Sequence, residues 1–202
     1  MFLKESFLMN MVWLRRCFHS RGFGIQSPSV YRFVRYVINE HYLYYAYDDL
    51  KHKYPKTSPV ERKLLQLYFR IANACQAHNW VIIDKLDNPE VYGRKVDYIQ
   101  HGCYKTRCLH INYIEQLCED EVFDVVVIQA NNDGIDYFRY LFPHLSTRSL
   151  VIVEGIYHNK ASQVFWTAIK NSQQVGITFD LYYCGVVFFD KDRYKKNYYI
   201  NF

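Results

Sequence analysis

The sequence predicts an α/β protein in which helices precede a mostly parallel β-sheet, and three observations lead to this prediction. Apolar residues recur at helical spacing up to Gln76. From Trp80 onward they form short runs that alternate with helical patterns, as parallel strands joined by crossover helices do. The last two runs are joined only by Tyr182–Gly185, too short for a crossover, so these strands pair antiparallel. We expect a helical segment over 1–78 and an α/β domain over 79–202, packed as one compact unit.

The expected helices of the first segment follow from start signals and breaks. Ser27 and Ser58 are each followed by proline, which is typical of an N-cap and a first helical position. Val30, Phe33 and Val37 then recur at helical spacing, and a tyrosine-rich stretch continues to Tyr54. The predicted helices cover residues 1–18, 28–40, 41–54 and 58–76.

The second segment contains seven short apolar runs that predict strands and two patterns that predict helices. The helices are Asp136–Leu145 and Lys160–Lys170. The strand candidates are Trp80–Asp84, Val96–Ile99, Leu109–Ile111, Phe123–Ile128, Leu150–Val153, Gly176–Leu181 and Val186–Phe189.

Composition excludes several classes of protein. Half of the 202 residues are hydrophobic and 22% are charged, so the chain can bury a core and is not globally disordered. The 20 Tyr and 14 Phe predict half-buried rings at surfaces, and with them a protein partner or a homo-oligomer. A net charge of +5 without a long basic run does not indicate nucleic acid.

The cysteines and the N-terminus indicate a cytoplasmic protein. Six scattered cysteines are too few for a disulfide scaffold and predict reduced, mostly buried thiols. The apolar N-terminus is interrupted by Lys4, Glu5 and Asn10, and Arg15 follows where a signal peptide would have small residues. No run approaches the length of a membrane span, so an amphipathic helix is expected there.

Five segments resemble, in order, segments of one bacterial branch of the class I S-adenosylmethionine-dependent methyltransferases. The resemblance implies a Rossmann-like methyltransferase fold with a mostly parallel sheet and an antiparallel C-terminal edge. The segments are Gly24–Tyr31, Lys63–Arg70, Phe123–Asn132, Leu150–Tyr157 and Asp180–Phe189.

The departures from this resemblance fall on functional positions. Where the family has Asp-Gly-Asn-His after the fourth strand, this chain has Gln129-Ala130-Asn131-Asn132, and Glu154-Gly155 replaces Asp-Asp after the fifth. In cation-dependent relatives these carboxylates hold a magnesium-like ion, which needs several hard oxygen ligands. Only Glu154 is left as a charged ligand, so we expect no divalent cation. Gln129 and Asn131 are also candidates for contacts with the cofactor, and we favour the alternative that they bond to loop backbone.

The elements that bind the cofactor in the family are also altered. No glycine follows Asp84 until Gly93, although the family has a glycine-rich turn after its first strand. The second strand candidate ends without the acidic residue that would hold the ribose. Asp84 or Asp87 are substitutes, and a turn or capping role is the alternative. We therefore expect S-adenosylmethionine to bind weakly or not at all, and to be the cofactor if the protein is active.

The interval Lys85–Val122 is too short for the two strands and two crossover helices of a complete fold. We expect the half of the sheet that would hold the adenosine of the cofactor, the cofactor half, to be shortened. The second and third strands cannot both pair parallel to their neighbours as they do in the complete fold. A hairpin in this interval would bring together two histidines and two cysteines, the ligand set of a structural zinc site. We favour the alternative, in which these are half-buried cysteines and surface histidines. The four residues are His101, Cys103, Cys108 and His110.

Two further features have a functional and a structural interpretation. Glu154 and His158 are both candidate catalytic residues. His158 follows the fifth strand and would act as a methyl-transfer base; otherwise it is a loop histidine that faces water. The aromatic and basic tail Arg193–Tyr199 fits either stacking on single-stranded nucleic acid or, as we favour, a final strand with a solvated face.

Three functions follow from these observations. The leading hypothesis is a methyltransferase-like protein that is non-catalytic, a pseudoenzyme with a binding or scaffolding role. The first alternative is an active S-adenosylmethionine-dependent O-methyltransferase acting on a small molecule. The second is a nucleic-acid-binding or zinc-dependent interaction module.

Overall fold

The computed structural model describes Leu14, Arg16 and residues 25–84, 88–113, 116–118, 120–131, 134–189 and 195–202. Seven strands form one sheet in the order β2-β1-β3-β4-β6-β5-β7. Every pairing is parallel except those that β6 makes with β4 and β5. The strands are β1 (Asn79–Ile83), β2 (Arg107–Ile111), β3 (Phe123–Gln129), β4 (Leu145–Glu154), β5 (Ile177–Asp180), β6 (Cys184–Phe188) and β7 (Lys196–Tyr199).

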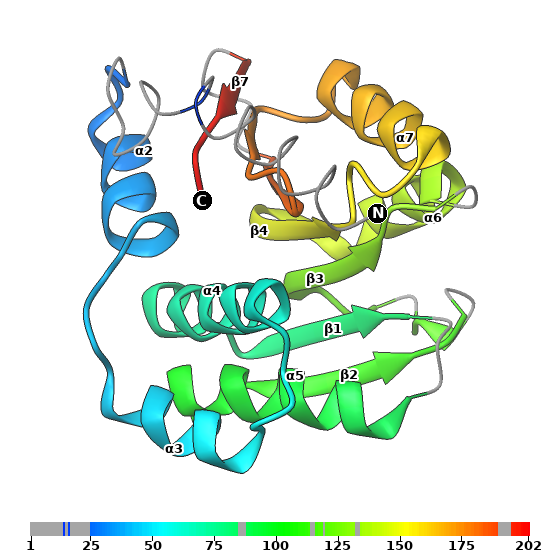
Figure 1. Ribbon diagram of the computed structural model, residues 1–202. Coiled ribbons are helices and arrows are strands. Elements are labelled where there is room, and N and C mark those ends of the chain that lie inside the picture. The colour runs from blue at the N-terminus through cyan, green and yellow to red at the C-terminus, as the bar shows by residue number, and fades with distance from the viewer. Residues whose placement is uncertain are drawn as a thin grey trace.

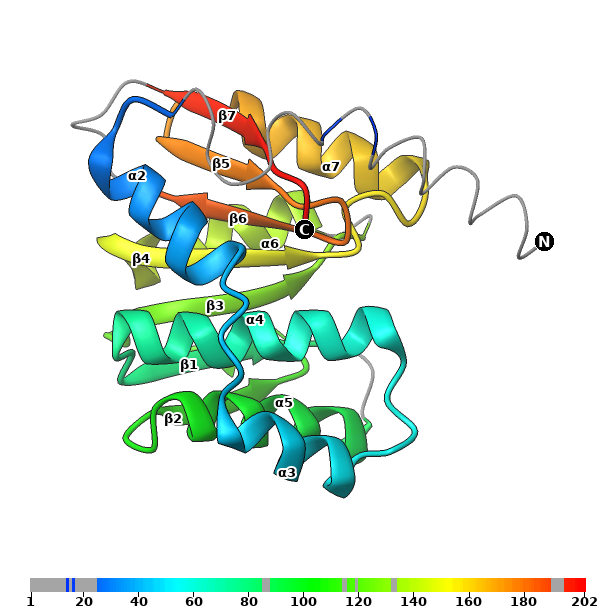
Figure 2. The ribbon, with the colours of Figure 1, turned by 60° about the vertical axis from the view of Figure 1, so that its left-hand side comes forward.

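Helices cover both faces of this sheet (Figure 1). One face packs against the helices that precede β1 and against α5, and the other packs against α6 and α7 (Figure 2). The helices are α2 (Pro28–Phe33), the π-helix η2 (Val34–Ile38), α3 (Tyr45–Lys53), α4 (Pro59–Cys75), α5 (Pro89–Gly102), α6 (Gly134–Leu141), the short 3-10 helix η4 (Phe142–His144) and α7 (Lys160–Asn171).

The central strands β1 and β3 and the second half of β4 are buried on both faces, and these segments are therefore almost continuously apolar. In β1, Trp80 and Ile82 face the core beneath α4, whereas Val81 and Ile83 face the core beneath α6 and α7. The mostly parallel sheet with an antiparallel C-terminal part is confirmed. The antiparallel strand is β6, and β7 forms the edge parallel to β5.

The N-terminal helices and the sheet share one of the two cores, which contains Val34 and Leu67 as well as Ile152. Arg70 of α4 is buried and donates to the carbonyls of Val37 (2.6 Å) and Ile38 (3.2 Å). These bonds satisfy carbonyl groups that the end of η2 leaves without helical partners. The predicted starts at Pro28 and Pro59 are confirmed, whereas the tyrosine-rich stretch becomes helical only at Tyr45.

The prediction of a strand at Val96–Ile99 was wrong, because these residues belong to α5. The Asn88 side chain accepts hydrogen bonds from the backbone N–H groups of Glu90 (3.1 Å) and Val91 (3.2 Å), and Pro89 occupies the first turn. Helix α5 is thus the crossover between β1 and β2. The four-residue gap before β2 did not prevent parallel pairing, since the element that precedes it is a helix.

The shortening of the cofactor half is visible in the element order. Between β1 and β3 the described residues form one long helix and one strand, α5 and β2, and β2 is the edge of the sheet.

Two further expectations can be compared with the described residues. No helix among them is long and apolar enough to cross a membrane. Their five cysteines are unpaired, but only Cys103 and Cys184 are buried, so the expectation of mostly buried thiols was wrong in part. Of the helix predicted over residues 1–18, only Leu14 and Arg16 are described.

Candidate functional site

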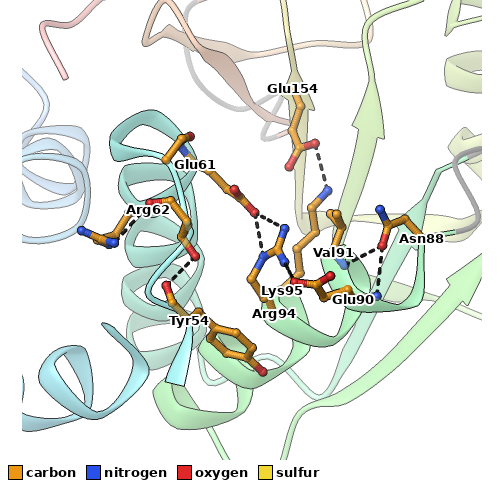
Figure 3. Close-up of polar contacts among 11 residues, drawn as sticks. Tyr54, Glu61, Arg62, Asn88, Glu90, Val91, Arg94, Lys95 and Glu154 are labelled. Atoms are coloured by element: carbon orange, nitrogen blue, oxygen red, sulfur yellow. Dashed lines mark hydrogen bonds and ion pairs between the residues drawn. The ribbon is translucent and has the colours of Figure 1, made fainter. Parts of the chain in front are cut away.

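A buried polar cluster surrounds Glu154 at the carboxyl end of β4. The Glu154 side chain accepts a hydrogen bond from the Tyr68 hydroxyl on Oε1 and from the Gln129 amide on Oε2. The Lys95 ammonium lies 2.9 Å from Oε2 (Figure 3). Both oxygens of the carboxylate are therefore engaged by donors, one of which carries a positive charge.

Four elements bring these groups together. Gln129 and Glu154 are register partners at the ends of β3 and β4, so their side chains leave the sheet on the same face. Tyr68 comes from α4 and Lys95 from α5, the two helices that lie against this face. The preceding side chain of α5, Arg94, turns instead to the surface carboxylates of Glu61 and Glu90 (Figure 3).

The electrostatics of the cluster hold the Tyr68 phenol in its neutral form. Burial raises the pKa of Tyr68 well above its ordinary value, and the Glu154 carboxylate raises this pKa further. Lys95 and Glu154 are 7% and 8% exposed, so each charge is compensated by the other in a region that water does not reach freely.

The donor set does not fit a divalent cation. Such an ion needs several oxygen ligands and carboxylate charge to offset its desolvation. Here Glu154 supplies the one carboxylate of the cluster, and an ammonium, a phenol and an amide already occupy its two oxygens. A carboxylate in this state is also not free to act as a general base.

The other predicted site residues lie around this cluster with different surroundings. Asn131 follows β3, and its Oδ1 atom is buried without a hydrogen-bond partner among the described residues. Asp84 is half-buried at the end of β1, where its N–H donates to the carbonyl of Ile111 at 3.2 Å. His158 is exposed in the turn after β4, and Asp87 lies outside the described residues.

The hairpin on which the zinc hypothesis depends does not form, because His101 and Cys103 lie at the end of α5 rather than on a strand. His101 Nδ1 is 2.7 Å from the carbonyl of Asp97, while the His110 ring on β2 stacks on a tyrosine ring. Cys108 is half-buried on β2, where burial raises the pKa of its thiol to about 11. Within the part of the chain that the structure describes, no three metal-ligating side chains form a cluster.

Two residues of the cluster, Tyr68 and Lys95, were missed by the sequence analysis. A signal for Lys95 exists in Asn88-Pro89-Glu90, which is a helix start. A helix begun there places Lys95 two turns later, on the face that holds Tyr98 and Ile99 against the core. The sequence offers no comparable signal for Tyr68, because a buried tyrosine in an amphipathic helix is an ordinary core residue.

No family model matches the sequence, and no curated protein matches it. Solved structures do match. A candidate caffeoyl-CoA O-methyltransferase from Staphylococcus aureus is 13% identical, with a TM-score of 0.53 over 71% of this chain and 91% of that chain. The chain has a class I methyltransferase-like fold.

Two other structures support this assignment of the methyltransferase-like fold. A protein from Corynebacterium glutamicum is 13% identical, with a TM-score of 0.51 over 80% of this chain and 96% of that chain. The SAH-bound methyltransferase PaMTH1 from Podospora anserina is 12% identical, with a TM-score of 0.50 over 86% of this chain and 98% of that chain. The resemblance inferred from sequence segments is thereby confirmed for the fold.

Proposed function

We propose that this protein is a methyltransferase-like binding or scaffolding protein that does not carry out cation-dependent methyl transfer. The observation that carries the proposal is the ion pair of Lys95 with Glu154 at the carboxyl end of β4. In open α/β sheets, ligands bind at this end of the strands. Where relatives with a metal need carboxylates, the register pair at the ends of β3 and β4 has one carboxylate, Glu154, with an ammonium beside it.

The energetics of this pair favour a structural role. Moving Lys95 away to admit another cation would leave its ammonium without a partner in a buried environment, which is strongly unfavourable. Gln129 could add only a neutral amide oxygen to a metal site, and it uses its amide nitrogen to bond Glu154. The cluster is therefore satisfied as it stands and resembles a closed polar core more than a site awaiting a ligand.

A binding role is supported by the aromatic segment that joins η2 to α3. Tyr42 is 64% exposed, Leu43 85% and Tyr45 92%, which is unusual for large apolar side chains so close together in sequence. We propose that a protein partner or a second copy of the chain covers this segment. Nothing in the charge of +5 favours nucleic acid as that partner.

The alternative function is an active S-adenosylmethionine-dependent O-methyltransferase that acts on a small molecule without a cation. Two observations favour it. The Podospora anserina neighbour has the same fold and is SAH-bound. Asp84 stands half-buried at the end of β1, where a carboxylate could accept hydrogen bonds from ribose hydroxyls.

Calorimetric titration with S-adenosylmethionine and SAH separates the two proposals. We expect no saturable heat for either ligand, and no rise in melting temperature at millimolar ligand, because a ligand that binds the native state stabilises it by mass action. Micromolar affinity that is lost on Asp84→Ala would overturn the non-catalytic proposal and support the active enzyme. Asp48→Ala, which changes a carboxylate in α3 away from the strand ends, is the matched control.

A further inference from the structure

A second buried carboxylate, Asp180 at the end of β5, binds the guanidinium of Arg16. Asp180 is 1% exposed. Arg16 Nη2 lies 2.8 Å from Asp180 Oδ1, and Nη1 donates to the backbone carbonyl of Asp180 at 3.0 Å. One planar guanidinium thus contacts both the side chain and the main chain of the same residue, as the fixed donor fork of arginine allows.

Three tyrosine rings surround this guanidinium. The Arg16 Cζ atom lies 5.9 Å from the ring centroid of Tyr157, 5.7 Å from that of Tyr182 and 5.6 Å from that of Tyr199. The rings of Tyr157 and Tyr182 are stacked on each other at 5.4 Å. All three distances are within the range in which a cation is attracted to an aromatic face. We call Asp180 and these three tyrosines the cation cage.

The sheet and α7 hold the Asp180 carboxylate in place independently of Arg16. Its Oδ2 atom accepts hydrogen bonds from the Tyr157 hydroxyl (2.6 Å) and from Trp166 Nε1 (2.9 Å), and its Oδ1 atom accepts one from the N–H of Tyr182 (3.1 Å). Tyr182 adopts φ 72°, a left-handed conformation that a bulky residue rarely takes. Three donors other than Arg16 therefore hold the Asp180 carboxylate, and one of them is the N–H of Tyr182.

We propose that the cation cage is a guanidinium-binding site, and that Arg16 is an intramolecular occupant which another guanidinium group can replace. This inference does not depend on whether the protein transfers methyl groups. The cage lies at the carboxyl ends of β4, β5 and β7, and its floor is the Asp180 carboxylate, which pairs with Arg16 from a distant part of the chain.

The geometry selects a guanidinium over an ammonium. Two nitrogens of Arg16 contact the side chain and the main chain of Asp180 at once, which the single point charge of an ammonium does not reproduce. The guanidinium could belong to a free small molecule or to an arginine side chain of a peptide.

Chemical rescue tests the proposal. Arg16→Ala leaves a buried carboxylate without its cation, and we expect the melting temperature to fall by about 5 °C or more. Methylguanidinium chloride at about 20 mM should restore at least half of this loss in a saturable manner, as mass action requires, whereas sodium chloride at equal ionic strength should not. The double variant Arg16→Ala with Asp180→Asn should show no rescue. Acetyl-arginine methylamide in parallel distinguishes the sources, since equal or better rescue indicates an arginine of a peptide.

A measurement on the wild-type chain keeps the test decisive if Arg16→Ala does not fold. The indole N–H of Trp166 bonds the cage, so its NMR signal should shift on titration with methylguanidinium, while the signal of Trp80, a buried indole in the other core, stays fixed. In the Arg16→Lys variant, the Trp166 signal should shift at lower methylguanidinium concentrations, because a lysine ammonium fits the cage less well than the arginine guanidinium does. A folded Arg16→Ala chain without rescue, or a Trp166 signal unmoved in both chains, would overturn the proposal.

Discussion

The Lys95 ammonium and the Glu154 carboxylate lie 2.9 Å apart although 59 residues separate them in the chain. Their contact joins α5 to the end of β4 across the region in which a methyltransferase fold presents its strand ends. Because both side chains are buried, neither charge can be removed without leaving the other uncompensated.

Lys95→Met should therefore destabilise the protein strongly. Breaking a buried ion pair by removing one partner costs about 3–5 kcal/mol, and urea denaturation would measure the loss. Replacing both charges, with Lys95→Met and Glu154→Gln together, should recover much of it, because the neutral amide oxygen can still accept the hydrogen bond of Tyr68. The matched control is Glu90→Gln on the same helix, where the side chain is 78% exposed and a change below about 0.5 kcal/mol is expected. A loss of unfolding free energy in Lys95→Met that is no larger than the loss in this control would refute a structural role for the pair.

Replacing each of two glycines of α5 by alanine should change the stability of the protein in opposite directions. A Cβ at Gly102 would stand 2.2 Å from the carbonyl oxygen of Phe69, so the close contact between α4 and α5 must open. We expect Gly102→Ala to cost at least about 1–3 kcal/mol, the range of an overpacked core. A Cβ at Gly93 has no atom within 4 Å, and Gly93→Ala should stabilise by about 0.5–1 kcal/mol. Thermal melts of both variants test the prediction, and equal effects would contradict it.

Tyr68 should make the stability fall in alkaline solution. Its pKa is raised in the folded state by burial first and then by Glu154, so its contribution is complete below the unfolded value of about 10 and is lost as pH rises through the folded value. Above pH 10 this one group lowers stability by about 1.4 kcal/mol per pH unit. Tyr68→Phe should remove that part of the slope of unfolding free energy against pH. Tyr104→Phe, which alters an 81% exposed ring, should leave the slope unchanged.

A magnesium site should require removal of the lysine. Gln129→Asp places a second carboxylate beside its register partner Glu154, but the Lys95 ammonium already neutralises that partner. We expect millimolar magnesium to raise the melting temperature of a Lys95→Ala, Gln129→Asp double variant and to leave Gln129→Asp alone unaffected. Binding by the single variant would show that the ammonium moves aside readily.

The sequence predicted the elements whose signals are local. The runs Trp80–Ile83, Val125–Ile128 and Leu150–Val153 within β1, β3 and β4 are continuously apolar, and proline after serine marked the starts of α2 and α4. Helix α5 was mistaken for a strand because Val96, Tyr98 and Ile99 form a short apolar run, which periodicity alone does not assign.

The Glu154 cluster could not be predicted once α5 was misplaced. Its members come from four elements, and Lys95 reaches Glu154 only if the chain between β1 and β2 is helical. The cation cage likewise depends on a contact over 164 residues between Arg16 and Asp180, for which no local pattern exists.

Strand β7 covers the hydrogen-bonding edge of β5 and so determines which backbone groups the edge of the sheet exposes. All four residues of β5 are buried, and without β7 its edge would expose a row of unpaired N–H and C=O groups beside apolar side chains. Such an edge is a template for pairing with other chains. The strand that covers it is only four residues long and begins with an exposed lysine, Lys196. The outermost edge of the sheet is therefore short and charged, which discourages the growth of intermolecular sheets and amyloid-like aggregates.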